Sequence, residues 1–445
     1  MSHVGKLRKT LFGIIDEVCS QREKYFTSSK KDFTRRGKFK PQDIFKSILL
    51  MENKSLSHEI LPYFDYKMDS PTPSAFVQAR AKIKPEGFEA VFYGFVSETT
   101  DDNKKYLHKG YRIFAVDGSD SHVPDNPDDH DSYFPNPNGR QYNLFHIDAM
   151  YDLLRRTYTD VVIKKKRTAN EREAFVEMVE KHRNDKIPII FTADRGYESY
   201  NDMAHVTECG HKFVIRVKDI DSKGVLSDMG LPDTYFDKSM TLKLIRRATN
   251  EIKEMKKTDN LIRYVRGKFD YLPIDHRHNV PAQFYELPVR IVRFKVKNTT
   301  EVIMTNLSKE EFSASEIKKI YGMRWGIETS FRDLKHTIGL NYYHAKKSDS
   351  ILQEIYSRMV MYNFSQLVTN SAKIKRPKSK RGRKFAYRIN FSQSVQICRD
   401  FLRNKIRCKD VLELIEKYIL PIRGGKDHPR TNSPRREIYF NFRLA

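Results

Sequence analysis

Three acidic residues of this chain have surroundings that suit phosphoryl-transfer chemistry. Asp117 directly follows the apolar run 113–116, Asp194 comes shortly after the apolar run 187–191, and Glu328 lies in a segment of strong helical periodicity. Hard divalent cations prefer carboxylate oxygens. Two such cations can activate a hydroxyl for attack on a phosphodiester and stabilise the leaving oxygen. If the three carboxylates converge, metal-dependent cleavage or transfer of a phosphodiester is the expected chemistry.

The segment around Glu328 predicts one helix from about 315 to 338. At about 100° per residue, Tyr321, Arg324, Glu328 and Lys335 fall within roughly 60° of one another around the helix. An adjacent apolar stripe, able to pack on a sheet, consists of Ile320, Met323, Ile327, Phe331, Leu334 and Ile338. The ordinary alternative for Glu328 is an ion pair with Arg324 one turn away, which stabilises a helix by only roughly 0.3 kcal/mol.

The two aspartates need a sheet to bring them together. Strands are expected at 112–116, 144–150, 158–163, 187–191 and 213–217, with a helix capped by Asn170 between the third and fourth. This order of three strands, helix, strand, helix, strand predicts an α/β fold with a ribonuclease-H-like mixed sheet. Ligands gather at strand ends in such sheets. An Asp after a strand is also a common turn former, so each aspartate counts only together with the other carboxylates.

The flanks of this core have a different character. Residues 1–104 are expected to be helical, with Thr72 capping a helix that begins at Pro73. Its pattern directs Phe76 and Val77 inward and leaves Gln78, Arg80, Lys82 and Lys84 free to meet DNA. That arrangement resembles a helix-turn-helix, and an ordinary amphipathic helix explains the pattern equally well.

Bulk composition points to a polyanionic partner. The chain has 82 Lys and Arg against 57 Asp and Glu, a formal net charge of +25, which attracts nucleic acid first and an anionic membrane surface second. No apolar run approaches the roughly 18 residues of a membrane span. The four cysteines are scattered, which fits a reducing cytosol and argues against a structural metal.

Several other acidic residues have ordinary explanations. Asp148, Asp152 and Asp160 lie on or beside predicted strands and are expected to be exposed or to form turns. Asp120 is a rival to Asp117 as first metal ligand, although its place beyond the expected strand end makes it the weaker candidate.

The helix pattern Tyr321-x-x-Arg324-x-x-x-Glu328-x-x-x-x-x-x-Lys335 matches the YREK signature of bacterial DDE transposases of the insertion-sequence-four type. The stretches 115–119 and 192–197 resemble that family's two aspartate motifs, and the long gap before Glu328 is similar to its β-rich insertion. The only tryptophan is Trp325, whereas relatives in that family use a Trp in the insertion to stack an unpaired base.

The resemblance implies specific roles. Asp117, Asp194 and Glu328 would bind Mg²⁺, with Mn²⁺ as an alternative, and no other cofactor. Three further side chains would grip DNA phosphates, namely Tyr321, Arg324 and Lys335. Arg195 and Tyr197 would be secondary DNA contacts, for which a role in the turn and in packing is equally plausible. The partners would be double-stranded DNA at the element ends and the target, bound by a homodimer in the bacterial cytoplasm at the nucleoid.

The expected domain organisation has five parts. These are a helical DNA-binding region (1–104), the first part of the ribonuclease-H-like core (105–217), a β-rich insertion (218–310), the core's YREK helix (311–345) and a helical basic C-terminal region (346–445). Within the last part, Lys373–Lys384 is expected to be a solvated loop. Two other functions stay open: a metal-dependent nuclease without joining activity, and a DNA-binding derivative that has lost catalysis.

Overall fold

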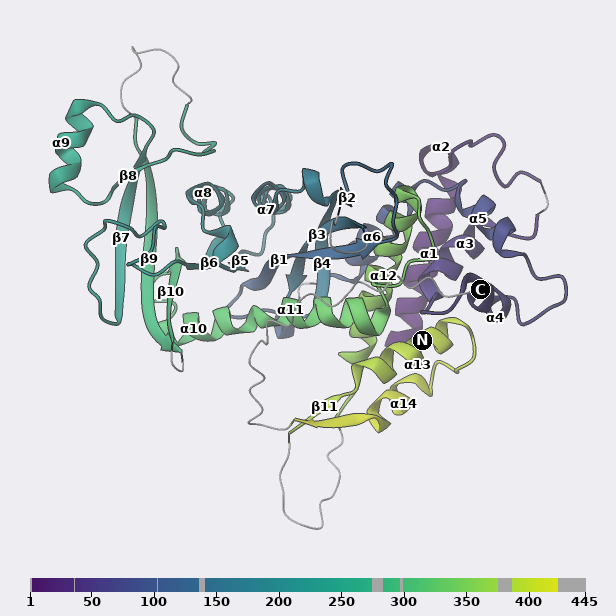
Figure 1. Ribbon diagram of the computed structural model, residues 1–445. Coiled ribbons are helices and arrows are strands. Elements are labelled where there is room, and N and C mark those ends of the chain that lie inside the picture. Colours follow the sequence, from purple (N-terminus) through teal and green to yellow (C-terminus); the bar gives the residue numbers. More distant parts are fainter. Residues whose placement is uncertain are drawn as a thin grey trace, which may run out of the picture.

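The computed structural model describes residues 2–35, 37–101, 103–135, 141–273, 283–296, 299–374 and 386–422. A long mixed sheet runs through the molecule (Figure 1), with helices on both of its faces. At one end the sheet continues into the inserted strands, and at the other the N-terminal helices lie together with the C-terminal ones. This arrangement places the core between two flanking regions.

The N-terminal region is helical, as predicted. Its helices are α1 (His3–Ser20), α2 (Arg22–Tyr25), α3 (Pro41–Leu50), α4 (Leu56–Tyr63), α5 (Pro73–Arg80) and α6 (Pro85–Thr99). The Thr72 hydroxyl accepts from the amide of Ala75, which confirms the predicted cap of α5. Two predicted orientations in α5 are wrong: Val77 is 48% exposed and Arg80 is 1% exposed. Arg80 turns inward because it finds a buried carboxylate on a distant helix.

The core sheet has the predicted ribonuclease-H-like topology. Its strands are β1 (Arg112–Val123), β2 (Tyr133–Phe134), β3 (Tyr142–Asp152), β4 (Thr157–Lys165), β5 (Ile189–Ala193) and β6 (Lys212–Val217). β3 pairs antiparallel with both β1 and β4, whereas β5 pairs parallel with β1 and with β6. The resulting order β4-β3-β1-β5-β6 is the mixed sheet expected from the sequence.

Helices cover both faces of this sheet because its strands bury both sets of alternating side chains. Ile113 and Ala115 of β1 belong to the core on the side of α10 (Ala314–Met323) and α11 (Trp325–Arg332). Phe114 and Val116 belong to the opposite core, with α7 (Glu171–Glu180) and α8 (Tyr200–Glu208). In a strand, successive side chains point to opposite faces. Along β1, odd-numbered residues therefore face α10 and α11, and even-numbered residues face α7 and α8.

The segment expected to be a β-rich insertion extends the same sheet. Its elements are β7 (Phe236–Ile245), α9 (Asn250–Thr258), β8 (Ile262–Tyr264), β9 (Tyr285–Val296) and β10 (Thr299–Thr305). β10 pairs antiparallel with β6 of the core and with β9, which joins β7. The added strands therefore continue the hydrogen bonding of the core sheet.

The C-terminal part is organised around the long helix α12 (Ser348–Thr369), which packs against α6, α3 and α13. It is followed by β11 (Ala386–Ile389), α13 (Phe391–Leu402), α14 (Val411–Lys417) and β12 (Ile419–Ile422). Most of the charged run Lys373–Lys384 lies outside the described residues. No helix within the described ranges is both long and apolar enough to cross a membrane.

Candidate active site

The two predicted aspartates occupy matching positions on neighbouring parallel strands. The last paired residues of β1 and β5 are Ala115 and Thr192, and Asp117 and Asp194 each come two residues later. The sequence predicted that Asp117 ends its strand, and this is wrong, because β1 continues to Val123 along β3. The parallel pairing with β5 ends at Ala115, two residues before Asp117. By strand alternation both aspartates belong to the side that faces α10 and α11.

The third carboxylate reaches this place from the helix layer. Glu328 lies in α11, and its Oε1 is 2.7 Å from Nη2 of Arg324. The other terminal nitrogen of Arg324, Nη1, is 4.0 Å from Oδ2 of Asp117. The ion pair named as the ordinary alternative for Glu328 is thus present, and it includes Asp117 as well. Gly326 lets α11 pack closely against Leu153, since a Cβ there would meet Leu153 Cδ2 at 2.9 Å.

The electrostatics of Asp117 reflect three nearby charges. Burial raises its pKa to about 7, the Arg324 guanidinium opposes the rise, and the negative charges of Asp194 and Glu328 add to it. A carboxylate whose pKa is raised by burial and by neighbouring negative charges is typical of functional sites. The structure therefore brings the three predicted carboxylates into mutual electrostatic contact, although they come from positions up to 211 residues apart in the sequence.

These residues suit a divalent metal by the chemistry of their donor set. Three carboxylates offer hard oxygens, and a cation, the Arg324 guanidinium, already lies within reach of Asp117 and Glu328. As placed, no three His, Cys, Asp or Glu side chains in the described part of the chain are close enough to hold an ion. Because Arg324 holds Oε1 of Glu328, that oxygen becomes available to a metal only after the guanidinium moves away.

Lys335 lies in a π-helical turn, η4 (Asp333–Ile338), that directly continues α11. A π turn has more residues per turn than an α-helix, so the constant angle assumed for Lys335 from the sequence does not hold. The Lys335 ammonium donates to the hydroxyl of Ser119 and to the carbonyl of Asp120, both at 2.7 Å. Burial lowers its pKa, against the nearby charge of Asp120. Lys335 is therefore docked on β1 just beyond Asp117.

The other predicted DNA contacts differ in exposure. Arg195 is exposed, Tyr321 is only 4% exposed, and Tyr197 is 1% exposed. The ring of Tyr197 packs 5.4 Å from that of Phe175 between centroids, so in this conformation it has the packing role. Trp325, in contrast, is 52% exposed next to Arg324. These positions leave Arg195 as the accessible member of the predicted secondary contacts.

The opposite face of β1 and β3 carries a charged cluster that the sequence interpretation missed. His146 Nδ1 is 2.6 Å from Asp120, and its Nε2 is 3.2 Å from both Asp148 and Glu171. Burial lowers the pKa of His146, but hydrogen bonds to these carboxylates outweigh burial and raise the pKa to about 11. Gly118 is required here, because a Cβ would meet His146 Nε2 at 2.6 Å. Asp120, paired in this way, lies on the other face from Asp117.

The expectation that Asp148, Asp152 and Asp160 are exposed is wrong, since they are 0%, 4% and 2% exposed. Asp152 does form a turn, accepting from the amides at 154 and 155. Asp160 accepts from the hydroxyl of Tyr93. The alternation of His146 and Asp148 along β3 was the available signal, because side chains two apart share one face of a strand.

A cavity of about 740 Å³ borders the turn after Asp194. Its lining includes Gly196 of that turn and His146 and Glu171 of the charged cluster. Basic side chains also line it, namely Lys166, Arg172, Arg266 and Lys268. The cavity thus joins the core to the inserted segment with a surface of mixed charge.

Comparison with known proteins gives a structural neighbour and a family match. Among solved structures, the chain resembles a piggyBac transposase synaptic complex with hairpin DNA, with 11% sequence identity and a TM-score of 0.44 over 96% of this chain and 86% of that one. No curated protein matches. The model of the family described as the transposase DDE domain matches residues 108–364, which include all three carboxylates. By that match, the chain belongs to the transposase DDE domain family.

Proposed function

We propose that this protein cuts DNA at the ends of a mobile element and joins those ends to target DNA. The observation that carries the proposal is the convergence of Asp117, Asp194 and Glu328 at one edge of the parallel strands. The YREK pattern supports placing it with the insertion-sequence-four type of transposase. The excess of 82 basic over 57 acidic residues supports DNA as its partner.

The three carboxylates would hold Mg²⁺, or Mn²⁺ in its place. When bound, such ions activate the attacking oxygen and stabilise the leaving one. Arg324 is the residue that would exchange its partner Glu328 for a DNA phosphate, because guanidinium groups bind both anions in the same way. Lys335 would meet phosphate from its position on β1, and Tyr321 would join them after a local rearrangement.

Two successive displacements at phosphorus account for the proposed reaction. In the first, water forms a bond to phosphorus and the bond to the 3′ oxygen breaks, which leaves a 3′ hydroxyl and a 5′ phosphate. In the second, that 3′ hydroxyl loses its proton to solvent and bonds to a target phosphorus, whose own 3′ oxygen leaves and takes up a proton. Neither step needs an oxidant or a reductant.

The flanking regions would bind and organise the DNA. Helices of the first 104 residues expose Gln78 and Lys82 on and just after α5, and the basic residues at the 740 Å³ cavity lie beside the turn of Asp194. Because two element ends must be cut in concert, we propose that two copies assemble on DNA as a homodimer. A nuclease without joining activity and an inactive DNA-binding derivative are the competing functions.

The test is Mg²⁺-dependent strand transfer from a pre-cleaved end into a supercoiled plasmid, using as substrate the repeats that flank the protein's own gene. Wild type is compared with Asp194→Asn and Glu328→Gln, and with Lys319→Met, an exposed position on α10, as a matched control. DNA binding of each variant is measured in parallel by mobility shift in Ca²⁺.

We expect wild type and the control to join DNA, and both carboxylate variants to bind the ends without joining them. Nicking without joining by wild type would favour the nuclease. Binding without nicking or joining would favour the inactive derivative. Full activity of either carboxylate variant would contradict the assignment of the metal ligands.

A further inference from the structure

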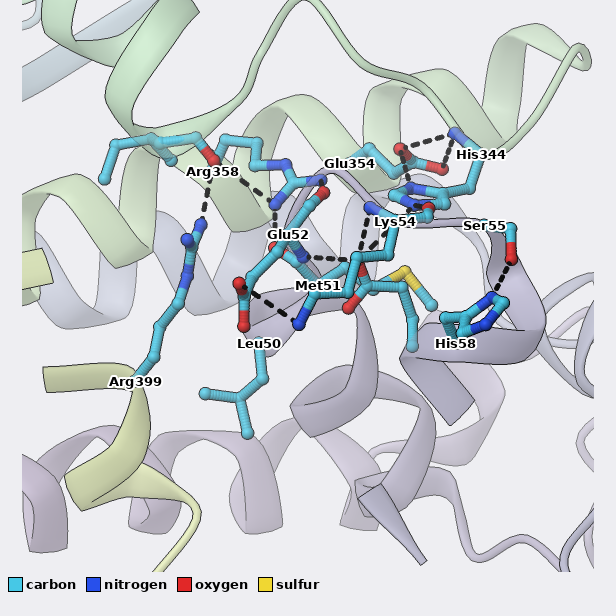
Figure 2. Close-up of polar contacts among 12 residues, drawn as sticks. Leu50, Met51, Glu52, Lys54, Ser55, His58, His344, Glu354, Arg358 and Arg399 are labelled. Carbon is cyan, nitrogen blue, oxygen red and sulfur yellow. Dashed lines mark hydrogen bonds and ion pairs between the residues drawn. The ribbon is translucent and has the colours of Figure 1, made fainter. Parts of the chain in front are cut away.

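Helix α12 buries charged side chains as well as apolar ones. Arg358 is 1% exposed and lies between the turn that joins α3 to α4 and Arg399 of α13 (Figure 2). Its Nη1 donates to the carbonyls of Met51 and Ile338, the latter at 3.4 Å, and its Nη2 donates to the carbonyl of Glu52 at 3.1 Å. One guanidinium therefore joins the α3–α4 turn to the last residue of η4.

A second guanidinium binds the same carbonyl. Arg399 is 4% exposed, and its Nη2 donates to the Ile338 carbonyl at 2.8 Å. Burial, followed by the charge of Arg358, lowers the pKa of Arg399 to about 9. We call Arg358 and Arg399 with the Ile338 carbonyl the Ile338 clamp. Buried charges contribute little net stability compared with apolar residues of the same size, so stability alone explains this arrangement poorly.

The Ile338 clamp holds the turn that carries Lys335. Three residues before Ile338, the Lys335 ammonium is bonded to Ser119 and to the carbonyl of Asp120 on β1. Gly339 follows with a left-handed φ of 101°, and a side chain there would collide with Asn53 of the α3–α4 turn. The N-terminal helices and the Lys335 turn are thus in direct contact.

The same stretch of α12 also holds α5. Arg80, at the end of α5, donates at 3.0 Å to both Gln353 and Glu354. Glu354 lies one helical turn before Arg358, and it also pairs with His344 at 3.3 Å. Figure 2 shows Glu354 and His344 beside the α3–α4 turn. Neighbouring turns of α12 therefore hold α5, through Glu354, and η4, through Arg358.

We propose that Arg358 is a positioning residue that couples the N-terminal helices to the Lys335 turn. DNA bound to the N-terminal helices would fix the position of the α3–α4 turn. Because Arg358 bonds both that turn and the Ile338 carbonyl, η4 would be fixed with it. Lys335 would then be held against β1 beside Asp117. This inference rests on the proposed function, because it assigns the N-terminal helices to DNA binding.

The test compares Arg358→Lys with Arg403→Lys as a matched control. A lysine at 358 has one nitrogen in place of the two terminal nitrogens with which Arg358 binds three carbonyls, so it cannot reproduce that geometry. Arg403 holds the same turn, through Glu52 at 2.8 Å and the Leu50 carbonyl at 2.7 Å, and within the described part of the chain it makes no hydrogen bond to η4. For each protein, we would measure thermal unfolding, binding of element ends, strand transfer, and amide hydrogen exchange of residues 333–341 with and without DNA.

We expect Arg358→Lys to bind ends within about twofold of wild type but to lose strand transfer by about tenfold. End DNA should slow exchange at 333–341 in wild type and in Arg403→Lys, and should not do so in Arg358→Lys. In a Lys335→Ala background, Arg358→Lys should cause no further loss, because the two residues act through one contact. Independent, multiplying losses, or an unchanged DNA effect on exchange, would overturn the coupling.

A second variant and a second readout separate failure of the coupling from failure of folding or of the proposed function. If Arg358→Lys does not fold, Arg399→Lys weakens the Ile338 clamp from its other side, and a partial loss of the DNA-dependent protection at 333–341 is expected. If wild type binds ends but joins nothing, the proposed function fails, while the exchange data still decide for or against the coupling.

Discussion

Two carboxylates, the half-buried Asp117 of the candidate active site and the buried Glu354 of α12, show opposite electrostatics. Burial raises the pKa of Asp117 to about 7, and two neighbouring carboxylates add to the effect. Glu354 is buried more completely, at 1% exposed, yet His344, Arg80 and Arg358 lower its pKa to about 2 against the effect of burial. One carboxylate is gathered with like charges, and the other is surrounded by cations.

The difference lies in the charges that surround each carboxylate. Charges that repel one another reduce stability and are kept where function needs them. Paired charges such as Glu354 and Arg80, 3.0 Å apart, are compensated and mutually dependent. The contrast teaches that burial alone does not identify a functional carboxylate, whereas the sign of its neighbours does.

The largest expected effect is on the active-site side. Asp117→Asn should reduce strand transfer by about a thousandfold or more, because the proposed function makes Asp117 a ligand to the catalytic ion. At neutral pH it should leave the free energy of unfolding unchanged or raise it, since a repelled charge is removed. Parallel strand-transfer assays and urea titrations measure both. A clear loss of stability would show that Asp117 serves the fold.

Glu354→Gln should have the reverse profile. Removing the charge leaves Arg80 buried without its ionic partner, so the free energy of unfolding should fall by about 3 kcal/mol. Urea unfolding measures this fall, and the exposed Glu173→Gln on α7 is the control. The effect on strand transfer should follow only the loss of folded protein and of end binding. A stable variant would mean that the α12 contacts are not a compensated network.

The comparison also predicts opposite pH dependences. Glu354 has a folded pKa near 2, below its ordinary 4.5, so its contribution to stability is present above pH 4.5 and is lost as the pH falls toward 2. Asp117 has a folded pKa near 7, above its ordinary 3.8, so its contribution is present below pH 3.8 and is lost as the pH rises through 7.

Unfolding at a series of pH values should therefore show two separate changes. Relative to wild type, Glu354→Gln should flatten the acid limb between about pH 4.5 and 2, whereas Asp117→Asn should alter only the range between about pH 4 and 7. If both variants changed the same limb, the distinction between the two carboxylates would fail.

The smallest expected effect concerns Arg324. Because Arg324 binds Glu328 at 2.7 Å, Arg324→Met should remove that competing positive charge and tighten Ca²⁺ binding without DNA by about threefold. Isothermal titration with Ca²⁺ measures this change, with Lys319→Met as the control. Weaker binding would show that the guanidinium organises the carboxylates instead of competing with a metal.

Much of the fold was predictable because local patterns report burial directly. The apolar run 113–116 and the β-branched runs predicted the strands, and the Thr72 and Asn170 side chains cap α5 and α7 as expected. The apolar stripe of the YREK helix packs as predicted, with Ile327, Leu334 and Ile338 at 0% exposed. Such features depend on neighbours within one turn or one strand.

The sequence by itself determined the order of elements and the chemical types in the motifs, since periodicity and residue type are local properties. Only the tertiary structure decided that Asp117 lies inside β1, that Arg80 faces Glu354, and that Asp148 is buried with His146. Each of these depends on a partner far away in the chain. A polar side chain turns inward only where another part of the fold supplies its counter-charge, and no local pattern records that partner.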